Sequence, residues 1–403
     1  MRIVLINHCH PATPHVCAVR AREFARALAR LGLEVVLLTQ TLEGQPVPIP
    51  ASDLAQTLAA HDFAVPYYLA CAPVGFSRLR RLRAGQLPAL IRRPLTLWQL
   101  LVHGGMFTDW RNGTQPYLEP LATQFKPDVV WATFGNTDSW NIAQQLAHTA
   151  RCPWIADVKD HWDAFIPAPL RGMTARRYRD AAAMTALSKS HVRTSGPWFG
   201  RTIDVVYSGF PTVWRHAKPE TETPGLQISL TGGLYDDAPL QDMCAALAAW
   251  FRTLNESDRA KVKLVYAGND GDKLRAALQT AGVPIPLDDR GFVSLDDLFA
   301  IYRRSRINMF LRTNRVFHHK ILELIAADRP ILCYPEESDE AKDIVADVSA
   351  MLYSCDSVAE IQHALTSAMG RHFTHADGAR LDRYSWDAQA EKLLAVFNRV
   401  VRR

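Results

Sequence analysis

The densest group of side chains suited to a phosphate follows a short apolar run at residues 307–311. This run has the length and composition of a buried parallel strand, and ligands of open α/β sheets bind beyond the carboxyl ends of such strands. Cations placed there, beside a helix N-terminus, can hold a phosphate. The residues concerned are Arg312, Arg315, His319 and Lys320, with Ser338 beyond the end of the next strand.

A predicted helix that begins at Lys320 carries a cation and a carboxylate together. It runs to about Ala327, and Pro330 stops it before a second buried strand at 331–334. Lys320 and Glu323 are three residues apart, so they share one face of this helix. Side by side, they can hold a phosphate and a sugar hydroxyl of the same nucleotide.

The apolar pattern predicts two α/β domains, as a length of 403 residues suggests. The first domain, 1–211, is separated by a polar linker, 212–225, from a second domain at 226–383, and a helix is predicted over 384–403. The predicted strands are 2–7, 34–39, 127–134, 153–158, 226–231 and 262–267, with helices at 20–31, 139–150 and 295–303.

Composition and charge exclude several classes of protein. A net charge of +5 and a pI near 8.8 are mildly basic, short of a dedicated nucleic-acid binder but compatible with anionic nucleotides. The seven cysteines are odd in number and never spaced C-x-x-C, which argues against a disulfide framework or structural zinc and favours reduced thiols. No apolar run reaches the roughly 18 residues that cross a bilayer, and the N-terminus is predicted as a strand rather than a signal peptide, so we expect a cytoplasmic protein.

Three histidines, His8, His10 and His15, occupy the loop predicted after the first strand. Imidazoles close together can bind zinc, so a metal site is one interpretation. Contact with substrate or water is favoured instead, because no recognised metal-ligand spacing is present.

A second polar strand end follows the strand at 153–158, where Asp157, Asp160 and His161 occur together. Two carboxylates and a histidine in a loop that faces a ligand can bind acceptor hydroxyls or take a proton. The structural alternative is a pair between Asp and Lys159 that holds the loop over a packed Trp162.

The turn at 231–235 leaves the first strand of the second domain and contains Gly232 and Gly233. Glycines let the backbone approach a phosphate with its amides free to donate. Taken alone the signal is weak, since paired glycines are also ordinary turn residues.

Residues 77–104 interleave six arginines with leucine, isoleucine and tryptophan. A basic amphipathic segment of this kind can lie on an anionic membrane surface. A solvated insertion in the first domain is the alternative, and the sequence leaves both open.

Two of these stretches resemble a known family. Residues 320–331 resemble the K-x-x-E-(Y/L)-hydrophobic-A-x-G-x-P segment of GT-B glycosyltransferases related to family 4. Residues 157–162 resemble the D-F-R-D-P-W segment of a bacterial branch of that group, mostly polysaccharide enzymes, and residues 384–394 resemble its final Y-S-W-x-x-Q helix. The departures are Arg315, which stands where family 4 commonly has a second glutamate, and a first loop that lacks the family's glycines.

The resemblance implies a GT-B fold of two facing Rossmann-like domains, with the C-terminal helix crossing back to the first. It implies transfer of a sugar from a UDP-, GDP- or TDP-sugar, in most relatives with retention, without a required metal or cofactor. In this pattern Glu323 holds the ribose, while Lys320 and Arg312 stabilise the diphosphate, and Asp160 and His161 are counted with the catalytic residues. The other donor-binding residues would be Gly232, Gly233, Tyr235, Gly291, Phe292, Val293, Arg315, His319 and Ser338.

The acceptor side would belong to the first domain. We expect its residues to include the loop histidines His8 and His15, together with Arg20, Asp157 and Ser188 at positions that resemble the family. The acceptor would be a glycan or a lipid-linked sugar, with the protein in the cytoplasm or on the inner face of the plasma membrane. No nucleic acid is expected as a partner.

Two other functions remain open at this point. A sugar-nucleotide epimerase of GT-B fold would act on the donor without an acceptor. A transferase-like subunit without activity would bind a partner protein, which the arginine at 315 and the glycine-poor first loop motivate.

Overall fold

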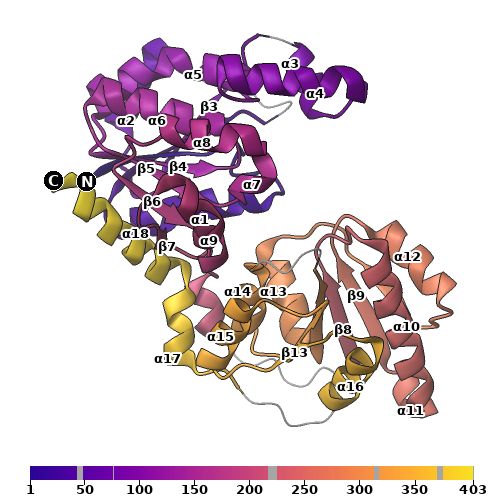
Figure 1. Ribbon diagram of the computed structural model, residues 1–403. Helices are drawn as coiled ribbons and strands as arrows, with labels where there is room; N and C mark the ends of the chain where they lie inside the picture. The colour runs from indigo at the N-terminus through magenta and orange to yellow at the C-terminus, as the bar shows by residue number, and fades with distance from the viewer. Residues whose placement is uncertain (43–48, 76, 217–224, 313–316, 370–374, 403) are drawn as a thin grey trace. The chain divides into compact units, whose positions relative to one another are not determined.

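Figure 1 shows the protein as a computed structural model, which describes residues 1–42, 49–75, 77–216, 225–312, 317–369 and 375–402. The chain divides into two compact units. The N-terminal unit comprises Met1–Ser208 together with Trp386–Arg403, and the C-terminal unit comprises Gly209–Ser385. Each unit has its own sheet, and every strand pair in both sheets is parallel.

The N-terminal unit is built on a seven-stranded sheet of order β3-β2-β1-β4-β5-β6-β7. Its central strands are mostly apolar because helices cover both faces of the sheet. Alternate residues of β1 enter opposite cores: Val4 and Ile6 pack on one side of the sheet, Ile3 and Leu5 on the other. The strands are β1 Arg2–Ile6, β2 Glu34–Gln40, β3 Tyr67–Cys71, β4 Val129–Phe134, β5 Trp154–Val158, β6 Ala183–Ala186 and β7 Asp204–Val205.

The helices of this unit lie on both sides of the sheet (Figure 1). They are α1 Val16–Arg30, α2 Leu54–Ala60, α3 Ser77–Arg83, α4 Ala89–Trp98, α5 Thr108–Pro120, α6 Thr137–Ala150, α7 Trp162–Phe165, α8 Ala168–Arg177, α9 Lys189–Phe199 and α18 Trp386–Val401. Helix α1 starts four residues before the predicted Arg20. The His15 side chain caps it by accepting a hydrogen bond from the amide of Cys17, a role that the sequence pattern did not indicate.

Helix α18 returns to the N-terminal unit and packs against α1. The rings of Phe24 and Trp386 meet edge-on at 5.2 Å. Gln389 is fully buried and its side-chain oxygen accepts a hydrogen bond from the Tyr207 amide at 2.9 Å. The expected return of the C-terminal helix to the first domain is confirmed.

The C-terminal unit repeats the plan with six strands in the order β10-β9-β8-β11-β12-β13. They are β8 Leu226–Thr231, β9 Val262–Ala267, β10 Leu287–Asp289, β11 Ile307–Leu311, β12 Ile331–Tyr334 and β13 Leu352–Ser354. The bounds predicted for β8, β9, β11 and β12 agree with the structure. The helices are α10 Asp237–Thr253, α11 Glu256–Arg259, α12 Gly271–Thr280, α13 Leu295–Arg304, α14 Lys320–Ala326, α15 Asp339–Asp347, α16 Val358–Ala368 and α17 Gly378–Leu381.

Both strand orders contain a switch point, where the chain turns from building one half of the sheet to the other. It lies between β1 and β4 in the N-terminal unit and between β8 and β11 in the C-terminal unit. Ligands of such sheets bind at the carboxyl ends of the strands beside the switch point. The loops after these four strands are therefore where a site is expected.

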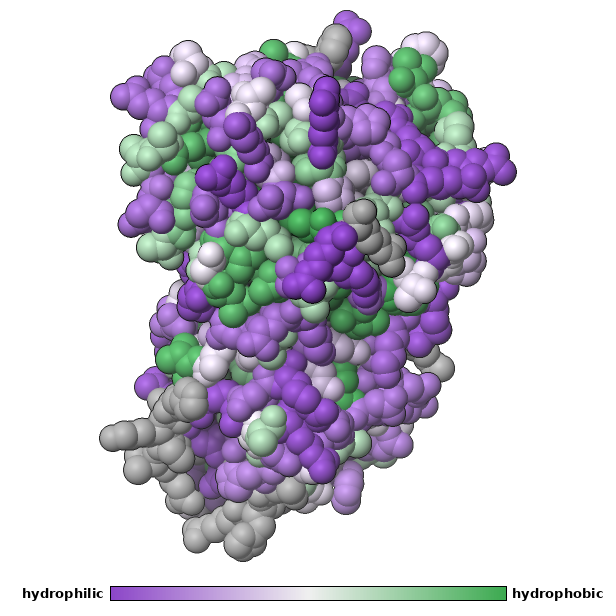
Figure 2. All heavy atoms as spheres, turned by 90° about the vertical axis from the view of Figure 1, so that its left-hand side faces the viewer, coloured by the Kyte–Doolittle hydropathy of each residue, from purple (hydrophilic) through white to green (hydrophobic). Residues whose placement is uncertain are grey.

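Hydrophilic residues predominate on the face shown in Figure 2, with hydrophobic residues in small groups between them. Within the part of the chain that the structure describes, no helix is long and apolar enough to cross a membrane. The predicted linker begins with a short 3-10 helix, Thr212–His216, and its residues 217–224 lie outside the described part.

Candidate functional site

Lys320 reaches the loop after β8 from the start of α14. Its ammonium group donates a hydrogen bond to the Thr231 carbonyl at 2.6 Å. A Cβ added to Gly232 would lie only 1.9 Å from Lys320 Nζ, so glycine is what leaves room for the cation. The switch point thus brings a lysine and a glycine loop together, as phosphate binding requires.

Glu323 lies one turn further along α14, on the same face as Lys320, and its side chain is half-buried. Burial raises the pKa of Glu323 and lowers the pKa of Lys320, and the opposite charge of each partner counters part of the shift. A carboxylate placed beside a lysine can accept hydrogen bonds from hydroxyl groups.

Three side chains that the sequence did not single out hold the glycine loop in place. The Tyr266 hydroxyl donates to the Gly232 carbonyl at 2.8 Å, and Asp270 accepts from the Leu234 amide at 2.8 Å. Lys273 donates to the Leu234 carbonyl at 2.6 Å. Of the three, Tyr266 could have been found from the sequence, because it lies near the end of β9 and polar groups at strand ends face this edge of the sheet.

Arg312 follows β11, and its guanidinium is buried and already engaged. Its Nε lies 3.2 Å from the Glu337 carboxylate, and it also donates to the Glu336 carbonyl. Burial raises the pKa of Glu337, and the charge of Arg312 lowers it in turn. The pair fixes the loop after β12, so a direct catalytic role for Arg312 stays a prediction that would require Glu337 to share its partner.

The remaining predicted donor residues are spread over several loops. Tyr235 and Phe292 are 76% and 57% exposed, and Val293 is half-buried. Gly291 has a φ of +61° and donates to Asp289 at 3.1 Å. His319 stacks on His318, Ser338 caps α15, Gly233 lies against the Tyr235 ring, and Arg315 lies outside the described residues.

The edge of the N-terminal sheet brings together polar residues of three loops. His8 follows β1 and lies against Gly135 after β4, since a Cβ added to Gly135 would come within 2.7 Å of its ring. Burial lowers the pKa of His8 to about 4, so its imidazole is neutral near pH 7. Asp160 accepts a hydrogen bond from Lys159 at 2.7 Å, and burial raises the pKa of this carboxyl. A neutral imidazole near a carboxylate can bind and orient sugar hydroxyls.

Arg20 and Asp157 form an ion pair with no solvent exposure on either side chain. Two guanidinium nitrogens contact the two carboxylate oxygens at 2.9 and 3.2 Å, and Thr185 donates to the same carboxylate at 2.7 Å. Ser188 is also fully buried, and it caps α9 while sharing a hydrogen bond with His191. Through these contacts Arg20, Asp157 and Ser188 hold the strand ends and loops of this edge in place. That they touch an acceptor stays a prediction.

The other histidines of this edge also have specific neighbours. The His161 ring stacks on His191 with centroids 4.1 Å apart. The exposed His15 lies close to Cys9 and Cys17. The sequence indicated no link between these two cysteines, because a spacing of eight residues from a loop into a helix follows no recognised metal-ligand motif.

Replacing Gly232 by alanine is expected to abolish binding of a nucleotide at the C-terminal unit. The new methyl group would overlap Lys320 Nζ, and the φ of +95° at this position is unfavourable for any residue with a Cβ. Thermal melting with and without nucleoside diphosphates measures the effect. Gly282→Ala, which changes another glycine of positive φ with no atom within 4 Å of its added Cβ, is the matched control.

Residues 17–208 match the family model described as the glycosyl transferase 4-like domain. No curated protein matches the chain. Solved structures of the same fold include HepE of Anabaena in complex with UDP and glucose, with a TM-score of 0.58 and 13% identity over 99% of both chains. Sucrose-phosphate synthase of Thermosynechococcus elongatus has a TM-score of 0.64 at 13% identity, over 99% of this chain and 98% of that one. A UDP-forming trehalose-phosphate synthase of Burkholderia xenovorans has a TM-score of 0.58 at 13% identity over 99% of both chains.

The fold is therefore that of GT-B glycosyltransferases, with a parallel sheet in each of two Rossmann-like units. The matched domain lies in the N-terminal unit. With this domain, the chain is an enzyme of glycosyl transfer.

Proposed function

We propose that the chain transfers a sugar from a nucleoside diphosphate sugar to a glycan or lipid-linked acceptor. The observation that carries the proposal is the contact of Lys320 with the Thr231–Gly232 turn, with Glu323 on the same face of α14. It is supported by HepE, whose structure contains UDP and glucose, and by the UDP-forming synthase of similar fold. The C-terminal unit would bind the donor, and the polar sheet edge of the N-terminal unit would bind the acceptor.

Sugar transfer requires the donor site to stabilise the leaving group and to hold the nucleotide in place. As the bond between sugar and diphosphate breaks, negative charge grows on the leaving group, and Lys320 with the amides of the glycine turn is placed to stabilise it. Glu323 can accept hydrogen bonds from the ribose hydroxyls and so hold the nucleotide in register. At the other unit, His8 and Asp160 would orient the acceptor hydroxyl.

A panel of UDP, GDP, TDP and CMP tests this proposal through thermal stabilisation of the protein. One diphosphate nucleotide at about 100 times its Kd is expected to stabilise the fold by roughly 2.7 kcal/mol. Glu323→Ala should lose this shift, because it removes the ribose contact. Glu256→Ala, which changes an exposed glutamate of α11 in the same unit, should retain it.

The outcomes separate the candidate functions. No shift with any nucleotide, in protein that melts cooperatively, would contradict the transferase proposal and favour the partner-binding subunit. Binding followed by conversion of the donor sugar without an acceptor would identify an epimerase. Binding with transfer only when an acceptor glycan is present supports the proposal.

A peripheral contact with a membrane is supported by the segment 77–103, which begins with α3 and ends with the short helix η2, Gln99–His103. Helix α3 buries Leu79 and Leu82, whereas α4 and η2 expose a group of large apolar residues. Leu90 and Trp98 are 90% and 57% exposed, and the others of this group are Ile91, Leu97, Leu101 and Val102. The exposed arginines Arg92 and Arg93 lie on the same helix. Apolar residues that insert and cations that meet anionic headgroups fit a lipid surface.

Co-sedimentation with phosphatidylglycerol-containing vesicles checks this contact. The wild type is expected to bind anionic vesicles and to be released by salt, since part of the attraction is electrostatic. Leu90→Asp should reduce the bound fraction several-fold. Val65→Asp changes another exposed apolar residue elsewhere in this unit, and equal loss with both variants would contradict a specific contact.

A further inference from the structure

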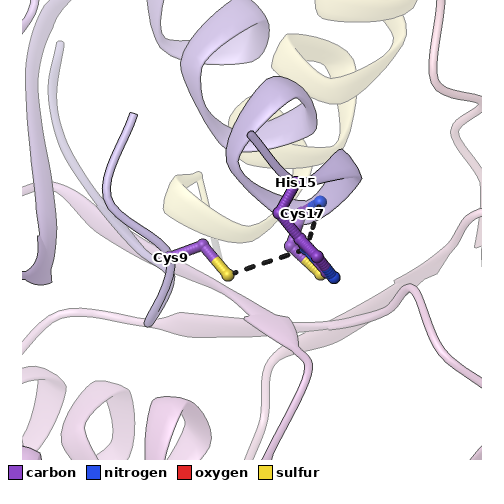
Figure 3. A group of neighbouring side chains, drawn as sticks. All are labelled: Cys9, His15 and Cys17. Carbon is purple, nitrogen blue, oxygen red and sulfur yellow. Dashed lines mark hydrogen bonds between the residues drawn. The ribbon is translucent and has the colours of Figure 1, made fainter. Parts of the chain in front are cut away.

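Cys9, His15 and Cys17 converge where the loop after β1 meets the first turn of α1 (Figure 3). One ligand atom from each, two sulfurs and an imidazole nitrogen, lies within 4.8 Å of the other two. The Cys9 sulfur is 3.8 Å from His15 Nδ1. Cys17 is buried, Cys9 is half-buried and His15 is exposed, so an ion could reach the group from solvent.

These distances suit the ligand shell of a tetrahedral metal ion. Zinc binds thiolate sulfur at about 2.3 Å and imidazole nitrogen at about 2.0 to 2.1 Å, which places such a sulfur and nitrogen about 3.6 Å apart. The observed 3.8 Å between Cys9 Sγ and His15 Nδ1 needs only a small adjustment, and Nδ1 would give up the hydrogen bond that it accepts from the Cys17 amide in order to bind the ion. We propose that Cys9, His15 and Cys17 form a binding site for one zinc-class divalent ion.

The charges around the group are compatible with such an ion. Two thiolates balance a divalent cation, and the imidazole is a neutral ligand. Lys159 lies 2.8 Å from the Cys17 sulfur and can donate a hydrogen bond to it as a ligand, while its own charge is balanced by Asp160 at 2.7 Å. Hydrogen bonds to ligand atoms are typical of the surroundings of a metal centre.

Three protein ligands leave a fourth position for water or another group, as in zinc sites that keep an open position. His8 is adjacent, with its Nε2 3.3 Å from the Cys9 sulfur. A bound ion would tie the loop after β1 to α1 at the sheet edge that also holds Asp160. The site does not depend on the proposed donor chemistry, because its residues all belong to the N-terminal unit.

Cobalt titration of the reduced, metal-stripped full-length chain tests the site. Co²⁺ is expected to bind one per chain and to give a sulfur-to-cobalt charge-transfer band that added Zn²⁺ removes. Cys9→Ser and His15→Asn should each weaken Co²⁺ binding by about tenfold or more, since even partners outside the ligand shell change metal affinity by about 10- to 100-fold. Asn can still cap α1, so His15→Asn removes the imidazole while keeping a cap.

The control is Cys152→Ser, which removes a half-buried cysteine that lies outside this group and should leave Co²⁺ binding unchanged. Melting temperatures within a few degrees of wild type would show that the variants are folded. Absence of the charge-transfer band in the reduced wild type, or equal Co²⁺ affinity in Cys9→Ser, would overturn the proposal.

Discussion

Replacing Lys320 by methionine is expected to lower kcat for sugar transfer by about 10²- to 10³-fold, the range measured for loss of one preorganised donor to a developing anion. Methionine has a similar length, so the contact with the glycine turn is filled while the ammonium is lost. The hydrogen bond at 2.6 Å to Thr231 holds this ammonium beside Gly232 before any substrate binds. Steady-state kinetics with the donor found in the nucleotide panel measure the effect.

Two comparisons make the result specific to this lysine. Lys261→Met removes an exposed lysine of the same unit and should leave kcat unchanged. Lys320→Arg keeps a cation and should recover part of the lost rate, although the broader guanidinium fits a site built for an ammonium poorly. A kcat for Lys320→Met within about twofold of wild type would contradict the proposal that Lys320 stabilises the leaving group.

Replacing Asp157 by leucine is expected to destabilise the N-terminal unit by about 3 to 5 kcal/mol. The change leaves the Arg20 guanidinium buried with its counter-charge gone, and Thr185 loses the acceptor of its hydrogen bond. Arg20 would keep its hydrogen bonds to Ser208 and to the Val206 carbonyl, at 3.2 and 3.0 Å, and its position over the Phe24 and Trp131 rings, but no counter-charge. Denaturant unfolding can be monitored by hydrogen exchange in peptides that contain β4 and β5. This measurement reports the stability of the N-terminal unit separately from that of the C-terminal unit.

A double variant separates the cost of the unpaired charge from the cost of repacking. Arg20→Met combined with Asp157→Leu removes both charges and should be much less destabilised than Asp157→Leu alone, because a buried ion pair can be replaced by apolar residues at little cost. If the double variant lost as much free energy of unfolding as the two single variants lose together, Arg20 and Asp157 would not be energetically coupled. Retained stability in Asp157→Leu, with loss of acceptor binding, would instead restore the predicted acceptor role.

The local structure of this protein could be predicted from its sequence to a large extent. The strands β8, β9, β11 and β12 have the predicted bounds because period-two alternation, as in β8, and short apolar runs, as in β12, both indicate strands. Lys320 and Glu323 could be placed on one helix face from their spacing alone. The predicted start of α1, at Arg20, lies four residues beyond the observed start at Val16. The reason is that His15 caps this helix, and histidine is not among the usual capping residues.

Which of these elements meet was decided only in the tertiary structure. Lys320 and Thr231 are 89 positions apart, and Arg20 and Asp157 are 137 apart. Their contacts depend on strand order: β1 lies beside β4, and β8 beside β11. Periodicity along the chain reports which face of an element is buried but carries no record of its neighbours. The same holds for Cys9, His15 and Cys17, since the turn into α1 that gathers them is set by packing against the sheet. The sequence by itself thus determined the elements and the chemical types at their ends. The strand order and packing within each unit determined which of those residues form sites.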